Sequence, residues 1–240
     1  MKRIPKYKII EDYIKEEISC QNLKPGDQIM TEEQLAERFN FSRMTISKAI
    51  NQLVEQGYIK RTPGRGSFVR APKVSKSLYN GSSFTEDMES IGLKAESKLL
   101  SYQVLKGSEI PEVAEKLSLS EDDYIHYFIR LRSGSGTPIA ISYTYISALV
   151  IPAIEVSCLD GSFYEFVRKL GIGTSRMDSE VRAIMPTQEQ KELLDIDNSS
   201  LLAMTHLTYT EIDGNLIPFE YIHTYYNGDL YTYRFHRPLP

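Results

Sequence analysis

The chain has 240 residues, a formal net charge of -4 and 41% hydrophobic residues, a composition typical of a globular protein long enough for two domains. It has no run of about 18 apolar residues and no continuous apolar stretch at its start, so we expect neither a membrane span nor a signal peptide. The two cysteines, Cys20 and Cys158, fit no metal or redox spacing, and neither do the four histidines. We therefore expect a cytoplasmic protein with reduced thiols, no metal and no cofactor.

The charge is unevenly distributed along the chain. Residues 1–76 contain 15 Lys and Arg against 9 Asp and Glu, a net charge of +6, whereas residues 77–240 contain 13 against 23, a net charge of -10. A basic head on an acidic body favours an anionic partner at one end only. The acidic total therefore does not exclude a nucleic-acid-binding protein.

The first 60 residues predict three helices. Lys6 to Cys20 has apolar residues at helical spacing. Thr31 and Gln34 form the N-terminal capping box of a second helix, and Ser42 is the N-cap of a third, which Gly57 ends. The third helix has one face predicted to be buried, formed by Ile46, Ala49, Ile50, Leu53 and Val54. Its other face carries Arg43, Met44, Thr45, Ser47, Lys48 and Asn51, and most of these side chains suit phosphates and base edges.

A basic hairpin is predicted after the third helix. Two short strand-like segments, 58–61 and 67–70, flank a turn that presents Arg65. Two helices joined by a tight turn and followed by a β-ribbon describe a winged helix-turn-helix, whose second helix lies in the DNA major groove. The alternative is an ordinary helical hairpin with a solvated charged face. The absence of acidic residues from Gln56 to Thr85 favours the DNA-binding interpretation.

These residues resemble the DNA-binding domain of GntR-type bacterial transcription regulators. The matching motifs are Pro25–Asp27 (PGD), Glu33–Ala36 (EQLA), Ser42–Thr45 (SRMT), Gln56–Tyr58 (QGY) and Gly64–Val69 (GRGSFV). The chain departs from the family at Ile29–Thr31, where Leu-Pro-Ser is usual, and at Gln34, where an Arg is common. The resemblance implies contacts to double-stranded operator DNA from Gln34, Arg43, Thr45, Ser47, Lys48, Arg65 and Gly66.

We expect residues 1–70 to form this DNA-binding domain and residues 71–83 to form a linker, because the linker contains Pro, Gly and Ser without helical or strand period. Residues 84–240 then form an α+β domain with a mostly antiparallel sheet. Its strands are predicted at 98–105, 124–132, 139–146, 176–185, 201–212, 217–226 and 230–236. Its helices are predicted at 84–92, 111–117, 162–171, with a capping box formed by Ser162 and Glu165, and 187–194.

Two arginines on one predicted strand face suggest an anion site in this second domain. Arg130 and Arg132 are two residues apart, and Ser162 caps a helix N-terminus, a position that attracts anions. The alternative is that the arginines pair with acidic residues and that Ser162 is only a cap. Glu220 could contact a hydroxylated ring, as could four tyrosines, although tyrosines in strands often only pack: Tyr209, Tyr221, Tyr225 and Tyr226.

Residues 84–236 also resemble the ligand-binding domain of the HutC branch of GntR regulators, which has the chorismate lyase fold. The matching motifs include Ser83–Met88 (SFTEDM), Ile129–Arg132 (IRLR), Gly136–Ala140 (GTPIA), Ser162–Glu165 (SFYE) and Pro218–Tyr221 (PFEY). The resemblance implies a homodimer and a small anionic effector, with a sugar phosphate held by Arg130, Arg132 and Ser162 and its sugar contacted by Glu220; Tyr226 is a further candidate. A Glu that often follows Pro138 in relatives is absent from Ala140–Tyr143.

The sequence therefore predicts a ligand-responsive transcription regulator, and a repressor in particular. Two alternatives stay open: an enzyme, since the second fold has an enzymatic relative, and a DNA-binding protein with no effector. The sequence shows no activated nucleophile, metal set or paired general acid and base. We therefore assign no catalytic residues.

Overall fold

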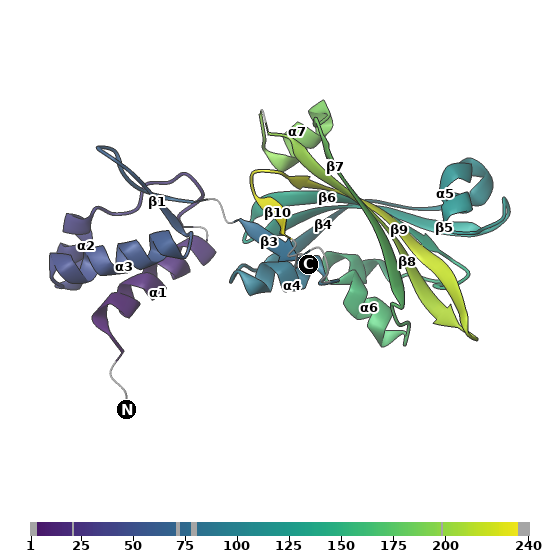
Figure 1. Cartoon of the computed structure of the whole chain (residues 1–240), viewed down its shortest axis with the longest axis horizontal. Coiled ribbons are helices and arrows are strands. Elements are labelled where there is room, and N and C mark those ends of the chain that lie inside the picture. The colour runs from purple at the N-terminus through teal and green to yellow at the C-terminus, as the bar shows by residue number, and fades with distance from the viewer. Residues whose placement is uncertain (1–3, 21, 71–72, 78–80, 198, 235–240) are drawn as a thin grey trace, which may run out of the picture. The chain divides into compact units, whose positions relative to one another are not determined.

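A computed structural model describes residues 4–20, 22–70, 73–77, 81–197 and 199–234. The chain divides into two compact units, Met1–Lys73 and Val74–Pro240, and each unit is described by itself (Figure 1). Within the described residues, no helix is both long enough and apolar enough to cross a membrane.

The first unit contains three helices, α1 (Lys6–Ser19), α2 (Glu32–Phe39) and α3 (Arg43–Glu55), close to their predicted bounds. The predicted capping box is present: Thr31 and Gln34 exchange hydrogen bonds of 2.9 Å and 3.2 Å at the start of α2. Apolar residues of all three helices form one core, and Ile46, Ala49, Ile50 and Leu53 of α3 are buried in it as predicted. This packing leaves the other face of α3 at the surface.

The predicted hairpin is formed by β1 (Ile59–Thr62) and β2 (Gly66–Val69), which pair antiparallel. Gly66 has φ +118°, a conformation that side chains with a Cβ rarely adopt, and a Cβ there would lie 2.4 Å from Nε2 of Gln28. The same Nε2 donates a 3.1 Å hydrogen bond to the Arg65 carbonyl oxygen. Gly66 therefore lets Gln28 support the tip of the hairpin.

The second unit is built on a six-stranded antiparallel sheet in the order β4-β5-β6-β9-β8-β7, which confirms the predicted α+β class. Strands β4, β5 and β6 form one run of consecutive antiparallel neighbours, β7, β8 and β9 form another, and the two runs join where β6 pairs with β9. The strands are β4 (Ala95–Lys106), β5 (Tyr124–Gly134), β6 (Thr137–Ser147), β7 (Arg176–Ile184), β8 (Leu201–Ile212) and β9 (Asn215–Asn227).

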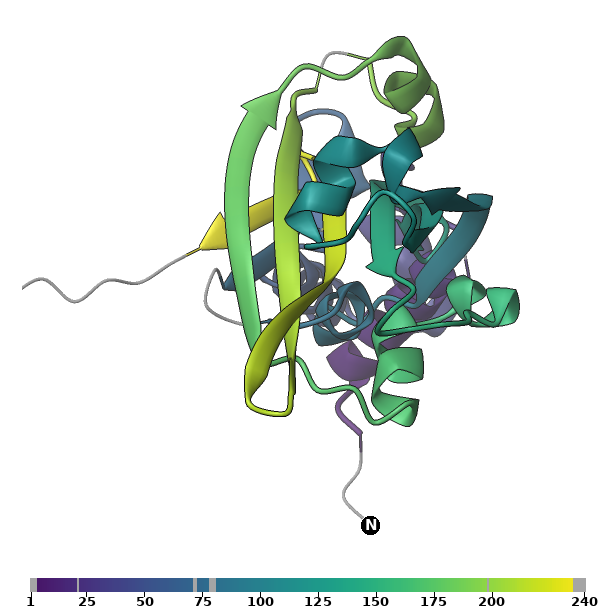
Figure 2. The same cartoon turned by 90° about the vertical axis from the view of Figure 1, so that its right-hand side faces the viewer.

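Helices cover both faces of this sheet (Figures 1 and 2). On one face, α6 (Phe163–Lys169) and the short helix η2 (Val156–Asp160) pack on a core that includes Phe128 and Phe219, and α4 (Phe84–Ser90) lies on the same side. On the other face, α5 (Pro111–Lys116) and α7 (Gln188–Leu194) pack on two separate apolar clusters. The short helix η1 (Gly107–Glu109) leads into α5.

The structure corrects two predictions. Within the expected linker, Val74–Ser77 forms strand β3, which pairs in parallel with β10 (Tyr231–Arg234); β10 falls within the strand predicted at 230–236. Residues 71–72, 78–80 and 235–236 lie outside the described residues, and the domain boundaries stay a prediction. The second correction concerns α6: Ser162 accepts a 3.4 Å hydrogen bond from the Glu165 amide, but the Glu165 carboxylate is paired with Lys169 at 2.9 Å instead of completing a capping box.

Candidate functional site

The first candidate surface is the exposed face of α3. Arg43 is its first residue, and its side chain is 76% exposed and donates a 2.7 Å hydrogen bond to the Glu33 carboxylate. The Thr45 hydroxyl lies 3.0 Å from that of Ser42, and the Lys48 ammonium lies over the Tyr7 ring, 4.3 Å from its centroid. Arg43, Thr45, Ser47 and Lys48 thus share the first two turns of one helix.

The other predicted DNA-contacting residues lie on different elements of the first unit. Arg65 and Gly66 are exposed at the hairpin tip, and Gln34 is exposed at the start of α2, where its side-chain oxygen accepts the capping hydrogen bond. Met44 is 85% exposed beside Arg43, although a large apolar side chain normally avoids water. An exposed Met on this face was seen in the sequence but not included among the predicted contacts.

The second candidate site is a cavity of about 210 Å³ in the second unit, on the α6 side of the sheet. All five residues predicted to bind an effector line it: Arg130, Arg132, Ser162, Glu220 and Tyr226. They come from β5, the start of α6 and β9, segments that are far apart in the sequence. The structure thus brings the predicted effector residues together.

Alternation along the strands decides which residues reach the cavity. On β9, Glu220, Ile222, Thr224 and Tyr226 line it, two residues apart. Tyr221 and Tyr225 belong to the opposite face, where they pack near α5 and α7. The suggestion that Tyr221 and Tyr225 line a sugar site is therefore wrong, and of the four tyrosines considered only Tyr226 is part of the cavity lining.

Arg130 and Arg132 are 3% and 8% exposed, which is unusual for arginine. Arg130 donates two long hydrogen bonds of 3.4 Å to the carbonyl oxygens of Leu159 and Gly161, and Arg132 lies over the Phe84 ring, 4.5 Å from its centroid. Among the described residues neither guanidinium forms an ion pair with a carboxylate, and the Nε atoms of both lack a hydrogen-bond partner. The alternative in which these arginines form ion pairs with acidic residues therefore does not fit the described residues, although Glu220 lies close enough to act on Arg130 through its charge.

Burial changes the pKa values of both arginines. Desolvation lowers the pKa of Arg130 to about 10, although the nearby Glu220 opposes the shift. Desolvation, together with repulsion from Arg130, lowers the pKa of Arg132 well below its usual value. Two cations held in a poorly solvated wall make the cavity a strong attractor for an anion.

Glu220 lies on β9, close enough to Arg130 for their charges to interact, and is held by two hydroxyl groups. Thr208 donates a 2.9 Å hydrogen bond to its carboxylate, and the Tyr164 hydroxyl donates another. Burial raises the pKa of Glu220, while the two hydroxyl groups and Arg130 oppose the shift. A fixed carboxylate beside the cation pair can accept hydrogen bonds from hydroxyl groups of a ligand.

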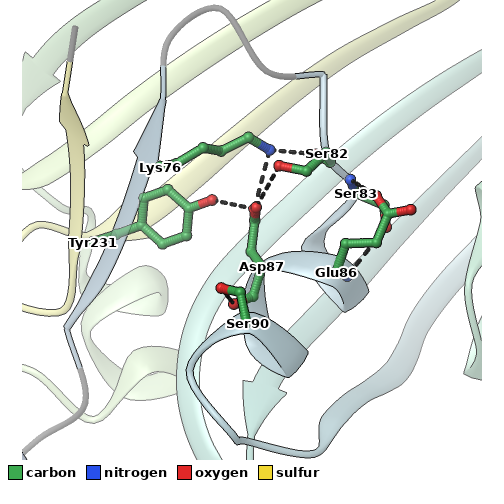
Figure 3. Close-up of polar contacts among 7 residues, drawn as sticks. All are labelled: Lys76, Ser82, Ser83, Glu86, Asp87, Ser90 and Tyr231. Carbon is green, nitrogen blue, oxygen red and sulfur yellow. Dashed lines mark hydrogen bonds and ion pairs between the residues drawn. The ribbon is translucent and has the colours of Figure 1, made fainter. Parts of the chain in front are cut away.

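A buried carboxylate holds a further part of the cavity wall together (Figure 3). Asp87 of α4 pairs with Lys76 of β3 at 3.0 Å and accepts hydrogen bonds from Ser82 at 2.7 Å and from the Tyr231 hydroxyl of β10. Lys76 and Ser82 themselves line the cavity. Asp87 therefore joins β3, β10 and the segment before α4 into one wall.

Sequence reasoning missed several lining residues, among them Lys76, Ser142, Ser179 and His206. Ser142 and His206 follow from the strand register, since Ser142 pairs with Arg130 and His206 pairs with Ile222. Their positions on β6 and β8 could have been found only with that register known. Lys76 carried no signal, because the segment around it showed no period in the sequence.

Two family models match the chain. Residues 6–69 match the model described as "Bacterial regulatory proteins, gntR family", and residues 90–232 match the UTRA domain. The first match covers the three helices and the hairpin, and the second covers most of the unit that contains the cavity.

Characterised relatives and a solved structure agree with these matches. The HTH-type transcriptional repressor NagR of Bacillus subtilis is 32% identical over 232 residues, which are 96% of this chain and 93% of that protein. The mannosyl-D-glycerate transport/metabolism system repressor MngR of Escherichia coli is 28% identical over 95% of this chain and 94% of its own. The crystal structure of PhnF from Mycobacterium smegmatis has the same fold, with a TM-score of 0.70 at 21% identity, covering 99% of this chain and 100% of that one.

The predicted resemblance to GntR regulators is thereby confirmed, and the relatives named above are regulators. The exposed face of α3 lies in the first matched domain, and most residues that line the cavity lie in the second. The chain belongs to the GntR family of bacterial regulatory proteins and is a DNA-binding transcription regulator with a UTRA effector domain.

Proposed function

We propose that the protein is a transcriptional repressor that binds its operator as a homodimer and changes its operator affinity when a small organic anion, a phosphorylated sugar, occupies the UTRA cavity. The observation that carries the proposal is the pair of buried arginines, Arg130 and Arg132, without a carboxylate partner among the described residues.

The arginine pair supports an anion because a buried cation is costly unless it is paired. A phosphate group offers oxygens to both guanidinium groups, including the two Nε atoms that have no partner. The Ser142 hydroxyl, which pairs in register with Arg130, also has no hydrogen-bond partner among the described residues. These groups supply several hydrogen bonds to one anion at the same place.

The part of the same sheet face formed by β9 supports a hydroxylated ligand. Glu220, Thr224 and Tyr226 project from one face of β9, and a carboxylate with neighbouring hydroxyls suits sugar hydroxyl groups. The relative MngR is named as a repressor of a mannosyl-D-glycerate system, a sugar derivative that carries a carboxylate. Both lines favour an effector with an anionic end and a sugar end.

The DNA side of the proposal rests on α3 and the hairpin. We assign base contacts to Arg43 and Arg65, and backbone contacts to Thr45, Ser47 and Lys48, with Gln34 and Gly66 at the edges of the surface. Two copies of α3, one from each protomer of a dimer, would contact two half-sites of the operator. A coupling free energy on the order of 1–3 kcal/mol between effector and DNA is enough for regulation.

The test is fluorescence anisotropy of the protein on DNA taken from upstream of its own gene, with a panel of sugar phosphates and the matching free sugars. We expect one phosphorylated sugar, and not its free form, to shift the binding curve by tenfold or more. Arg132→Ala should bind the DNA normally and lose the shift. The control is Arg182→Ala, which removes an exposed arginine of the same unit that is paired with Glu180 at 3.2 Å.

Tight DNA binding that the whole panel leaves unchanged would rule out the sugar phosphate and keep the DNA-binding assignment. The homodimer is tested separately by analytical ultracentrifugation of the free protein, where a monomer at micromolar concentration would contradict it.

A further inference from the structure

One end of the cavity is not explained by anion binding. It is formed by β7 and β8, where His206 and Ser179 stand directly opposite each other in the strand register. Nδ1 of the His206 ring lies 2.7 Å from the Ser179 hydroxyl, which fixes the orientation of the ring. In the sheet order, β8 is separated from β5 by β6 and β9, which is roughly 14 Å of strand spacing. The pair therefore faces a different part of the cavity from Arg130 and Arg132.

The surroundings of this pair are mostly apolar. Met177 and Met204 line the same end of the cavity, and Ile222 is the register partner of His206 on β9. The positive charge of Lys76 acts on His206, but Lys76 already forms a 3.0 Å ion pair with Asp87. An anionic ligand group would therefore find no free cation among the described residues lining this end.

The His206 ring itself is uncharged at neutral pH. Burial lowers the pKa of His206 to about 4, and the positive charge of Lys76 adds to the shift. A neutral imidazole has one nitrogen that donates and one that accepts a hydrogen bond. With Nδ1 at Ser179, Nε2 has no hydrogen-bond partner among the described residues and is free for a ligand.

We propose that His206 and Ser179 determine effector specificity by hydrogen bonding to an uncharged group, a sugar hydroxyl, at the end of the effector remote from its anion. This inference rests on the proposed function and adds to it the residues that distinguish one sugar phosphate from another. A site built to hydrogen-bond a hydroxyl discriminates against ligands without it, because its own polar atoms are then left unpaired.

Strand β8 also carries a matched pair with β9, on the opposite face of the sheet. Thr205 of β8 and His223 of β9 are also register partners, and His223 Nδ1 lies 3.0 Å from the Thr205 hydroxyl. This second pair has the same chemistry and similar geometry but does not line the cavity. It supplies a control for any effect that comes from losing a cross-strand histidine alone.

The experiment is isothermal titration calorimetry of the full-length protein with inorganic phosphate and with the 6-phosphates of glucose, mannose, galactose and glucosamine. The quantity of interest is the affinity for the tightest hexose phosphate divided by the affinity for inorganic phosphate. We expect His206→Leu and Ser179→Ala to lower this ratio by about tenfold and about threefold, and to change phosphate affinity less than twofold. His206→Gln, which keeps a polar tip, should lower it less than His206→Leu, and His223→Leu should leave it unchanged.

The outcomes separate this inference from the proposed function. Three outcomes overturn the inference alone. The affinity ratio could stay unchanged in both His206→Leu and Ser179→Ala, or it could fall equally in His223→Leu. The wild type could also bind no hexose phosphate better than inorganic phosphate. Failure of the wild type to bind any of these anions overturns the proposed function as well. Should His206→Leu not fold, as judged by its thermal unfolding, Ser179→Ala carries the test because it removes only one oxygen atom.

Discussion

The two domains use arginine in opposite ways. In the DNA-binding domain, Arg43 and Arg61 are exposed and each forms a 2.7 Å ion pair with an acid of α2, Glu33 and Glu32 respectively. In the effector domain, Arg130 and Arg132 are buried, and neither is paired with a carboxylate within the described residues. The side chain is the same in both domains. These two arginines of the DNA-binding domain have water and a carboxylate partner, and these two of the effector domain have neither within the described residues.

The difference indicates what each domain's arginines must give up or gain when the ligand binds. An exposed ion pair contributes only about 0–1 kcal/mol, so DNA can replace the glutamate at little cost. A buried guanidinium without a carboxylate partner has lost its hydration and gained only weak contacts, two 3.4 Å hydrogen bonds to carbonyl oxygens for Arg130 and the Phe84 ring for Arg132, so an anion that reaches it is bound strongly. The DNA-binding domain exchanges one partner for another, whereas the effector domain gains a partner that it lacked.

The largest expected effect concerns the buried cation that does have a partner. Lys76 is paired with Asp87, and both side chains are nearly buried, at 11% and 5% exposed. Asp87→Ala should lower the free energy of unfolding by about 3–5 kcal/mol, because it leaves a buried lysine unpaired. Calorimetry on the full-length protein measures this, with Glu89→Ala on the exposed side of the same helix as control. A loss below 1 kcal/mol would show that Lys76 reaches water easily.

Replacing Arg132, the buried cation without a carboxylate partner, should instead raise the free energy of unfolding. Arg132→Met removes a buried charge with no carboxylate partner and keeps an apolar stem against Phe84, so we expect the ligand-free protein to gain roughly 1–3 kcal/mol of stability. Inorganic phosphate should raise the melting temperature of the wild type and leave that of Arg132→Met unchanged. Arg182→Met is the control. A destabilised Arg132→Met would mean that Arg132 has a stabilising partner in the free protein.

Local signals were enough to predict the first domain and most elements of the second. Caps such as Thr31 and Ser42, the helical period of α3 and the alternation of β5 depend on neighbours in the sequence, and the structure contains each of them. The same alternation placed Arg130 and Arg132 on one face, and the structure places both in the cavity wall.

Features that depend on distant partners were not predicted. Strand β3 exists because β10 pairs with it from the other end of the chain, and four residues with no alternation give no local sign of that. The lysine on β3 meets Asp87 only after that pairing (Figure 3). His206 was likewise invisible, since its place opposite Ser179 depends on the register of β7 and β8. Tyr221 and Tyr225 were wrongly predicted to line the site because they were chosen for their residue type. The alternation of β9 decides which face a residue lies on, and it places both on the other face.

Arg43 tests the DNA side of the comparison. Arg43→Ala should weaken operator binding by roughly 1–3 kcal/mol if the guanidinium contacts a base edge. Fold stability should change little, because the side chain is 76% exposed and its ion pair is on the surface. Anisotropy with operator and random DNA of equal length measures both effects. An equal loss on random DNA would show that Arg43 contacts only a phosphate.

The smallest effect, and the most direct test of partner exchange, is expected for Glu33→Gln. Removing the carboxylate frees Arg43 before DNA arrives, so operator DNA should bind about two- to fivefold tighter, and random DNA should gain less because it lacks the base that Arg43 contacts. Glu37→Gln makes the same charge change on an exposed position of the same helix. If Glu37→Gln tightens operator binding as much, the gain comes from net charge alone and Glu33 is not the partner that DNA replaces at Arg43. If only Glu33→Gln does so, the exposed ion pair is the partner that DNA replaces, in contrast to the buried arginines of the effector domain.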